Sequence, residues 1–96
     1  MDWSEWFYYD EASYSFLKRK KTVWAGKGHC MLVHEADSDC GFVDTDGYYR
    51  VSFQGKTPMS HRIIWELFNG VIPEGEFIDH IDGDRSNNNI SNLRCG

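Results

Sequence analysis

One stretch of the chain carries a helical pattern, and turn-forming residues lie on both sides of it. Its apolar side chains recur at helical spacing, as Ile63, Ile64, Leu67 and Phe68. Ser60 precedes this stripe as a candidate N-cap, and Asn69-Gly70 follows it as a candidate left-handed C-cap. The sequence therefore predicts one main helix over residues 61–68, with the rest of the chain built from shorter elements.

Short strands are predicted before and after this helix. Residues 48–53 alternate in polarity, Gly55-Lys56 has the composition of a hairpin turn, and residues 57–59 form the returning strand. After the helix, Phe77-Ile78 begins a short strand that ends in Asp79-His80. A tight polar loop over residues 82–89 then leads to a second short segment, residues 90–94. The expected fold class is α+β, with small antiparallel hairpins around one main helix.

The first half of the chain is less regular. Residues 3–9 are aromatic and suit a short helix, residues 13–24 suit a strand or hairpin, and residues 25–46 are rich in Gly and Asp and are expected to be irregular. With 96 residues and 16% aromatic content, the chain has the material for one small core. We expect a single domain, residues 1–96, made of an aromatic part (1–46) and a second part (47–96). The predicted core members are Ile63, Ile64, Trp65, Leu67, Phe68 and Phe77.

Composition also limits location and cysteine chemistry. The chain has no apolar run of membrane-spanning length and no basic start typical of a signal peptide, so a cytoplasmic protein without a membrane partner is expected. Its three cysteines contain no CxxC pair. The spacing of His29, Cys30, His34 and Cys40 fits no zinc pattern, which favours ordinary reduced residues over zinc ligands.

The charge is unusual for a protein that would bind nucleic acid. The net charge is −5, whereas a DNA-binding domain is expected to be basic. Residues 18–21 form one basic run, and an acidic group follows it, made of Glu35, Asp37, Asp39, Asp44 and Asp46. Both are commonly just solvated surface. Together they leave room for an edge that faces DNA and for a surface that repels or imitates DNA.

The segment from His61 to Arg94 resembles the HNH (ββα-metal) endonucleases of phages and mobile introns. It reads HRIIWELFNGVIPEGEFIDHIDGDRSNNNISNLR and matches the family's H-R-x-x-W helix, its D-H-x-D-G-D loop start, its N-N pair and its N-L-R end. The resemblance implies a metal-dependent hydrolase that nicks or cleaves duplex DNA. An isolated D-H or N-N pair would more often simply build a turn, but a match at this many positions favours common ancestry.

The resemblance also implies roles for single residues. His80 is the expected catalytic base, because imidazole titrates near neutral pH, and Asp79 is the expected ligand of Mg²⁺ or Mn²⁺. Alternation along a strand directs these two side chains to opposite faces. Asn92 is expected to brace the loop and so orient the base, while Arg62 and Arg94 are candidate phosphate contacts. His61 matches the family's H-R pair, and packing or capping is its more frequent use.

In the HNH family, the N-L-R segment leads into a helix that carries the last metal ligand, whereas this sequence reads Arg94-Cys95-Gly96 at its end. The HNH motif is therefore expected to be incomplete. Three explanations stay open: a shortened or fragmentary nuclease, an inactive descendant reused as a binding protein, or a site completed by a partner subunit. As a binding protein it would need no cofactor. It would inhibit a host nucleic-acid-processing or defence complex by placing the acidic group in a basic groove. The nuclease is slightly favoured, and a phage-encoded chain would act in the host cytoplasm.

Overall fold

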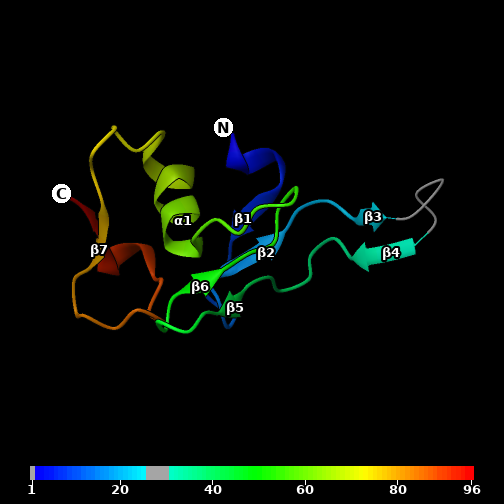
Figure 1. The fold of residues 1–96 in the computed structure, drawn as a ribbon, viewed down its shortest axis with the longest axis horizontal. Coiled ribbons are helices and arrows are strands. Elements are labelled where there is room, and N and C mark those ends of the chain that lie inside the picture. Colours follow the sequence, from blue (N-terminus) through cyan, green and yellow to red (C-terminus); the bar gives the residue numbers. More distant parts are fainter. Residues whose placement is uncertain (1, 26–30) are drawn as a thin grey trace.

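The computed structural model describes residues 2–25 and 31–96. The elements follow in the order η1 (Trp3–Glu5), β1 (Phe7–Tyr9), β2 (Leu17–Arg19), β3 (Val23–Ala25), β4 (Met31–His34), β5 (Phe42–Val43), β6 (Tyr49–Arg50), α1 (Ser60–Asn69), β7 (Ile78–His80), η2 (Ile90–Asn92) and β8 (Leu93–Cys95). Figure 1 shows α1 between β7 on one side and β1 and β2 on the other. The α+β class expected from the sequence is confirmed.

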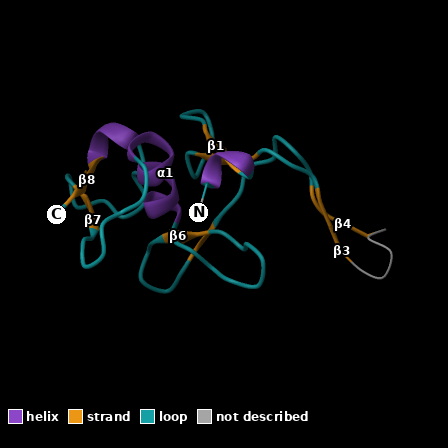
Figure 2. Ribbon diagram, turned by 90° about the horizontal axis from the view of Figure 1, so that it is seen from above, coloured by secondary structure: helices purple, strands orange, loops and turns teal. Residues whose placement is uncertain are grey.

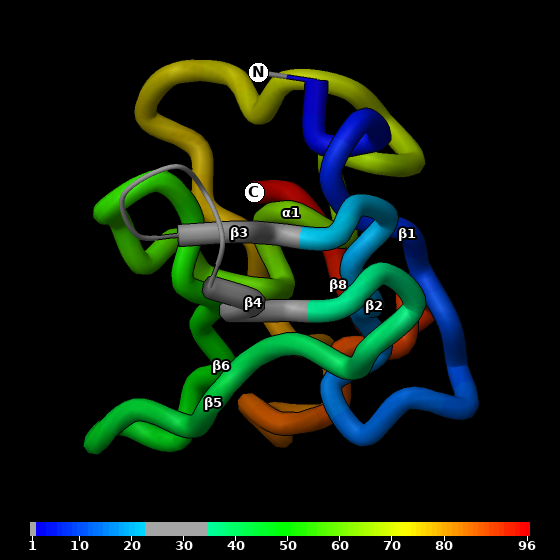
Figure 3. The backbone as a smooth tube through the Cα atoms, turned by 90° about the vertical axis from the view of Figure 1, so that its right-hand side faces the viewer, coloured from blue at the N-terminus to red at the C-terminus, as the bar shows by residue number. Residues whose placement is uncertain are grey.

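The described strands form four separate antiparallel pairs instead of one sheet: β1–β2, β3–β4, β5–β6 and β7–β8. Figures 1 and 3 both show β5 and β6 side by side, and the β3–β4 hairpin extends away from the other elements in Figures 1 and 2. A two-stranded hairpin is marginal by itself and needs packing on another element. The helix supplies that packing for the β1–β2, β5–β6 and β7–β8 pairs, because α1 contacts β1, β6, β7 and β8, and it also contacts η1.

The core lies between β1, β2, the segment after β6 and the inner face of α1. Its fully buried members include Phe7, Leu17, Val51, Ile63 and Ile64. Phe53 joins the core from the turn before α1 and meets Trp3 and Trp6 edge-on, at centroid distances of 5.4 and 5.3 Å. Aromatic residues of the first half therefore fill much of the interior, as the composition suggested.

Helix α1 begins at Ser60, so the prediction that Ser60 is the N-cap is wrong. Met59 occupies that position in extended conformation, without a side-chain hydrogen bond, while Ser60 is buried and its hydroxyl has no partner among the described residues. The helix ends at Gly70, whose φ of 85° suits glycine and whose N–H donates to the carbonyl of Glu66. Gly70 is thus the C-cap residue, although its ψ of −169° lies outside the left-handed helical region that was predicted.

Two predicted core residues are exposed. Phe68 is 54% exposed and Phe77 is 69% exposed, whereas Ile63 and Ile64 are buried and Trp65 and Leu67 pack against the core. Phe68 lies in the last turn of α1, where it only meets the edge of the Tyr9 ring at 5.2 Å. Phe77 directly precedes the buried Ile78, so strand alternation turns its side chain outward.

The regions predicted as strands are shorter than expected. In the segment 48–53 only Tyr49–Arg50 forms a strand, and it pairs with β5, which lies in the stretch predicted to be irregular. Residues 57–59 return beside it with one isolated bridge, between Arg50 and Met59. The turn falls at Gln54-Gly55, one residue earlier than predicted. These two residues have φ values of 48° and 77°, as the tight two-residue turn of a hairpin requires. Similarly, residues 3–9 divide into η1 and β1 instead of forming one helix.

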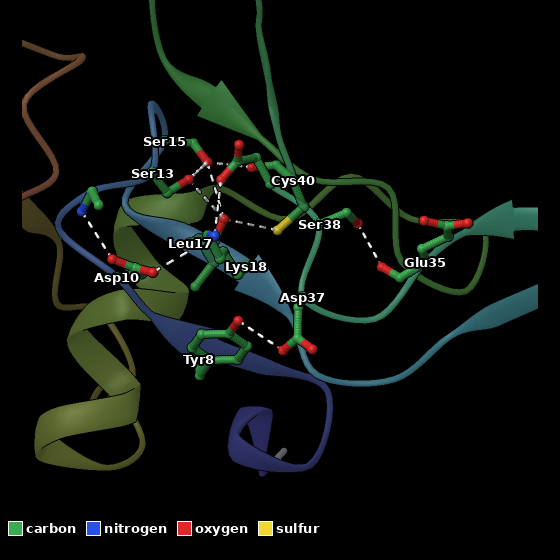
Figure 4. Close-up of polar contacts among 12 residues, drawn as sticks. Tyr8, Asp10, Ser13, Ser15, Leu17, Lys18, Glu35, Asp37, Ser38 and Cys40 are labelled. Carbon is green, nitrogen blue, oxygen red and sulfur yellow. Dashed lines mark hydrogen bonds and ion pairs between the residues drawn. The ribbon is translucent and has the colours of Figure 1, made fainter.

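Polar contacts hold β2 to the segment that precedes β5, as Figure 4 shows. The Ser15 hydroxyl donates to the carbonyl of Cys40, and the Cys40 thiol lies 3.4 Å from the carbonyl of Leu17. Burial raises the pKa of the Cys40 thiol to about 12, so it stays a neutral packing residue. His29 and Cys30 lie outside the described residues.

The basic run, residues 18–21, is not a continuous charged surface. Strand alternation buries Arg19 at 5% exposure, where it donates to the carbonyl of Ser52. Lys18 lies between Asp10 and Asp39, at 3.7 and 3.9 Å, as Figure 4 shows in part. Lys21 lies 4.5 Å above the Trp6 ring. Most of this charge is therefore used within the fold.

The first prediction compares two apolar residues of α1. Replacing the fully buried Ile64 by alanine should cost roughly 2–4 kcal/mol of unfolding free energy, because it removes buried methylenes and leaves a cavity. Phe68→Ala should cost under about 1 kcal/mol, because half of that ring is already exposed. Urea unfolding of both variants measures the difference. Equal losses would contradict the described orientation of α1.

Candidate functional site

Strands β7 and β8 place the D-H pair at the edge of the molecule. In their antiparallel register, Asp79 lies opposite Arg94 and His80 lies opposite Leu93. Asp79 points outward with a side chain that is 64% exposed, and its carboxylate lies 3.9 Å from the guanidinium of Arg94. His80 is half-buried. The structure therefore brings Asp79, His80 and Arg94 together on one hairpin, with the Asp79 carboxylate open to solvent.

One nitrogen of His80 is fixed by a buried amide. The Nε2 atom lies 2.7 Å from Oδ1 of Asn88, which is completely buried. Because an amide oxygen only accepts hydrogen bonds, Nε2 carries the proton in this pair, and Nδ1 keeps its lone pair. This tautomer follows from the hydrogen-bonded partner. The arrangement leaves one basic nitrogen on a ring whose orientation is set by Asn88.

The loop between β7 and η2 is held by side-chain amides and carboxylates. Nδ2 of Asn92 donates to Asp82 Oδ1 at 2.9 Å and to the carbonyl of Asn87 at 3.0 Å, and its Oδ1 accepts from the backbone of Asp82 at 3.1 Å. Asn87 closes the loop by donating to the second Asp82 oxygen at 3.0 Å. These donors hold the pKa of the Asp82 carboxyl below its usual value, first through Asn87. Asn92 therefore contacts the loop, while Asn88 contacts the imidazole.

His61, at the start of α1, packs against His80. The ring centroids of the two histidines are 4.8 Å apart, and the His61 ring stacks on Tyr48 at 5.5 Å. His61 is 4% exposed, and its Nδ1 has no hydrogen-bond partner among the described residues. Burial, followed by the neighbouring His80, lowers the pKa of His61 to about 4, so its imidazole is neutral at physiological pH. Tyr48 and His61 thus form one wall behind His80.

Two adjoining pockets open beside these rings. A pocket of about 350 Å³ is lined by residues that include Tyr48, His61, Arg62 and Asp79. A second pocket of about 180 Å³ shares Tyr48 and Asp79 with the first and adds His80, Gly83 and Arg85. Arg62 and Arg85 therefore bring positive charge to a surface that also carries the D-H pair.

The five residues of the acidic group are divided between two places. Glu35, Asp37 and Asp39 are exposed on the segment between β4 and β5, where Asp37 accepts a hydrogen bond from the Tyr8 hydroxyl at 2.8 Å. Asp44 and Asp46 lie in the turn between β5 and β6. Asp44 pairs with Arg50 at 2.7 Å, and its pKa is lowered, chiefly by that contact.

A divalent cation finds one carboxylate ligand at the D-H pair. Asp79 offers the hard oxygen that Mg²⁺ and Mn²⁺ prefer, and its exposed position leaves room for water and phosphate oxygens. Within residues 2–25 and 31–96, no group of three or more His, Cys, Asp and Glu side chains is arranged to hold a metal ion. At the D-H pair, the described residues therefore offer one exposed carboxylate to a cation and no ready-made cluster of ligands.

Comparisons with known proteins agree with this geometry. The family model described as "HNH endonuclease" matches residues 59–96, which contain α1, β7, the polar loop and β8. Residues 59–96, the HNH-type segment, are therefore the part of the chain that is similar to this family. The matched family is generally metal-dependent. The segment includes Arg62, Asp79, His80, Asn88 and Asn92, but not Tyr48 or the acidic group.

The chain is similar to two phage proteins. It is 51% identical over 39 residues to "Protein 3.8" of Escherichia phage T7, covering 41% of this chain and 32% of that protein. It is 41% identical over 56 residues to the "Uncharacterized gene 5.3 protein" of Enterobacteria phage T3, covering 52% of this chain and 55% of that protein. The chain thus spans about a third and about half of the lengths of these relatives. No solved structure matches it significantly. No helix in the described ranges has the length and apolarity needed to cross a membrane.

Three residues of the site were not predicted from the sequence. Asn88 lies in a run of three asparagines, and nothing in that run distinguishes the residue that meets His80. Tyr48 was assigned only to a strand face. Arg85 lies inside the polar loop, where a basic residue has no periodic pattern to mark it. Pairing of distant segments, instead of local pattern, makes these residues part of the site.

The second prediction concerns pH and the neutral His61. Its folded pKa near 4 lies below the ordinary value of 6.5, so the unfolded chain binds this proton first as pH falls. The contribution to stability is therefore complete above pH 6.5 and is lost between pH 6.5 and 4. Relative to His61→Phe, which keeps a ring but does not titrate, wild type should lose roughly 2–3 kcal/mol more between pH 7.5 and 4.5. Denaturant unfolding at both pH values measures this, and parallel losses would contradict it.

Proposed function

We propose that this chain carries the hydrolytic centre of a metal-dependent DNA endonuclease that nicks or cleaves the phosphodiester backbone. The observation that carries the proposal is the fixed imidazole of His80, which is bonded through Nε2 to Asn88 and lies next to the exposed carboxylate of Asp79. The arginines of the adjoining pockets, Arg62 and Arg85, add the charge that a phosphate group requires. The match of residues 59–96 to the HNH endonuclease family supports this assignment.

In this proposal His80 acts as the general base. Its Nδ1 lone pair takes a proton from a water molecule, which then attacks the phosphorus atom. The Asn88 oxygen accepts a hydrogen bond from Nε2–H and keeps the ring in the required tautomer. It also stabilises the positive charge that develops on the imidazole. The neutral His61 lies behind the ring and adds no positive charge that would oppose protonation of His80.

Asp79 would hold Mg²⁺ or Mn²⁺, which supplies charge stabilisation for the phosphate and the leaving 3′ oxygen. The nearby Arg94 lies 3.9 Å from this carboxylate. At 3.9 Å and with both side chains mostly exposed, this ion pair is weak enough to exchange. Arg94 would then contact a phosphate oxygen, as would Arg62, which lines the larger pocket. In a phage-encoded protein this would act on duplex DNA in the host cytoplasm.

The binding-protein alternative depends on a coherent acidic surface, and the charges offer limited support for it. Asp44 is neutralised by Arg50, and Asp39 lies within 3.9 Å of Lys18. Only part of the acidic group is therefore free to meet a basic groove of a host complex. A nuclease does not need the acidic group at the reacting phosphate. Changing these residues should therefore affect a nuclease and a binding protein differently.

The third prediction tests the base and its orientation. With Mg²⁺ or Mn²⁺, wild type should nick supercoiled plasmid, and His80→Ala should abolish nicking because no other described side chain replaces Nδ1. Asn88→Ala should slow nicking at least about tenfold by releasing the imidazole. Asn87→Ala is the matched control, since it removes an amide from the same loop that does not touch His80, and its rate should fall less than threefold.

Circular dichroism and thermal unfolding of each variant separate loss of fold from loss of chemistry. If wild type and His80→Ala are equally inert with both metals, the nuclease proposal is wrong. If Asn87→Ala and Asn88→Ala lose activity equally, the hydrogen bond to His80 is not what orients the base.

The fourth prediction separates the two functions by charge. The triple variant Glu35→Gln, Asp37→Asn, Asp39→Asn removes the exposed carboxylates between β4 and β5. Nicking by a nuclease should change less than twofold, because these residues are not at the D-H pair. A host-directed inhibitor would instead lose partner binding, and salt-sensitive recovery of a host protein by wild type but not by the triple variant would favour that function.

A further inference from the structure

Arg85 contacts a turn that is distant from it in the sequence. Its Nη1 donates to the carbonyl of Asp46 at 2.5 Å, and its guanidinium lies 4.9 Å from the centroid of the Tyr48 ring. Both partners belong to the turn between β5 and β6, which precedes Arg85 by almost forty residues. Figure 1 shows this turn close to the loop after β7. The bond and the stacking contact hold the guanidinium in one place.

The turn itself is rigid because one carboxylate organises it. Asp44 Oδ1 accepts hydrogen bonds from the backbone N–H groups of Asp46 and Tyr48, at 2.9 and 3.0 Å, and its Oδ2 accepts from Arg50 at 2.7 Å. Gly47 adopts a φ of 87°, which lets the chain reverse. The Asp46 carbonyl and the Tyr48 ring are thereby presented together to Arg85. The carboxylate of Asp44 thus fixes the turn that contacts the guanidinium of Arg85.

Arg85 is also one of few cations at the site without a carboxylate partner. Among the ion pairs of the described residues, Arg50 is matched by Asp44 and Arg94 by Asp79, whereas neither Arg62 nor Arg85 has one. One of the five guanidinium N–H donors of Arg85 is used by Asp46, which leaves donors for a ligand. Planar, preorganised guanidinium groups suit the paired oxygens of a phosphate.

We propose that Arg85, held by the turn of residues 44–48, is a phosphate-binding residue of the nuclease site and contacts the DNA backbone. The inference rests on the proposed nuclease function. It adds a role for the first half of the chain, since the turn sets the position of a charge that the HNH-type segment carries. The guanidinium contacts a backbone phosphate beside the one that is hydrolysed, so it contributes to duplex affinity in a sequence-independent way.

The test measures binding separately from cleavage. Affinity for a fluorescently labelled DNA duplex of about 20 base pairs is determined by anisotropy in EDTA, over a series of salt concentrations. Arg85→Ala should weaken binding at least about fivefold and reduce the slope of log affinity against log salt by about 0.9, the value for one phosphate contact. Arg85→Lys should keep the slope and lose part of the affinity, because the charge remains but the planar stack is lost.

Two variants test the contacts that hold Arg85 in place. Tyr48→Leu and Asp44→Ala keep the Arg85 charge but remove its stacking partner or the organiser of its turn. Each should weaken binding with little change in slope. Combining Asp44→Ala with Arg85→Ala should weaken binding no further than Arg85→Ala alone, because both act through the same contact. Lys56→Ala is the control, since Lys56 lines a separate pocket with Trp3 and Phe53 and should leave the slope unchanged.

An unchanged salt slope in Arg85→Ala, or additive losses in the double variant, would overturn the assignment of Arg85 while leaving the nuclease intact if wild type still nicks DNA. If wild type neither binds nor nicks duplex DNA, the proposed function fails instead. Because Asp44→Ala removes three hydrogen bonds, its thermal unfolding is compared with wild type. Tyr48→Leu provides a second test that leaves the three hydrogen bonds of Asp44 in place.

Discussion

The buried face of α1 is the contact on which the rest of the structure depends. The described strands form four separate pairs, and outside them backbone pairing is limited to short stretches such as the bridge between Lys18 and Asp39. Ile63 and Ile64 are almost completely buried, and α1 contacts η1, β1, β6, β7 and β8. Side-chain hydrogen bonds add to this packing: the indole of Trp3 donates to Glu66 on the helix at 2.9 Å. One short helix thus organises a chain in which each strand is only two to four residues long.

This dependence explains which predictions from the sequence succeeded. The helix was predictable because its apolar residues repeat at a period that no strand or loop would produce, and the strand that ends in Asp79-His80 followed from its bounding turns. Phe68 and Phe77 were misplaced because hydrophobicity does not show which side of a short element meets the core. Ser60 was misassigned as the N-cap because serine is a common residue at that position. In the structure, Ser60 is buried as the first residue of the helix. Hairpin pairing between residues 42–43 and 49–50 depends on partners that local patterns do not identify.

The same distinction applies to the candidate site. The D-H pair and Asn92 were expected from the resemblance, and the polar loop between them lies where the sequence predicted it. The contact between Asn88 and His80 was not predictable, because three adjacent asparagines are equivalent until the loop has a shape. Charge was misleading for a similar reason. The net charge of −5 describes the whole chain, yet many charges are cancelled locally, as in the pair of Asp44 with Arg50, or are buried, as in Arg19. The field at a phosphate-sized pocket depends on the few cations that remain unmatched.

The boundary of the HNH-type segment is therefore not the boundary of the site. The family match begins at residue 59, but Tyr48 lies before it and lines both pockets, stacks on His61 and supports Arg85. The hydroxyl of Tyr9, still earlier in the chain, accepts a hydrogen bond from the backbone of Ile90 at 3.2 Å, where the polar loop enters η2. Asn88, which bonds to the imidazole, and His61, which packs behind it, belong to the matched segment, whereas Tyr48, the other half of that wall, lies before the segment. Since the described residues contain one α-helix and no continuous sheet, such contacts between distant segments are what give the loop a defined shape.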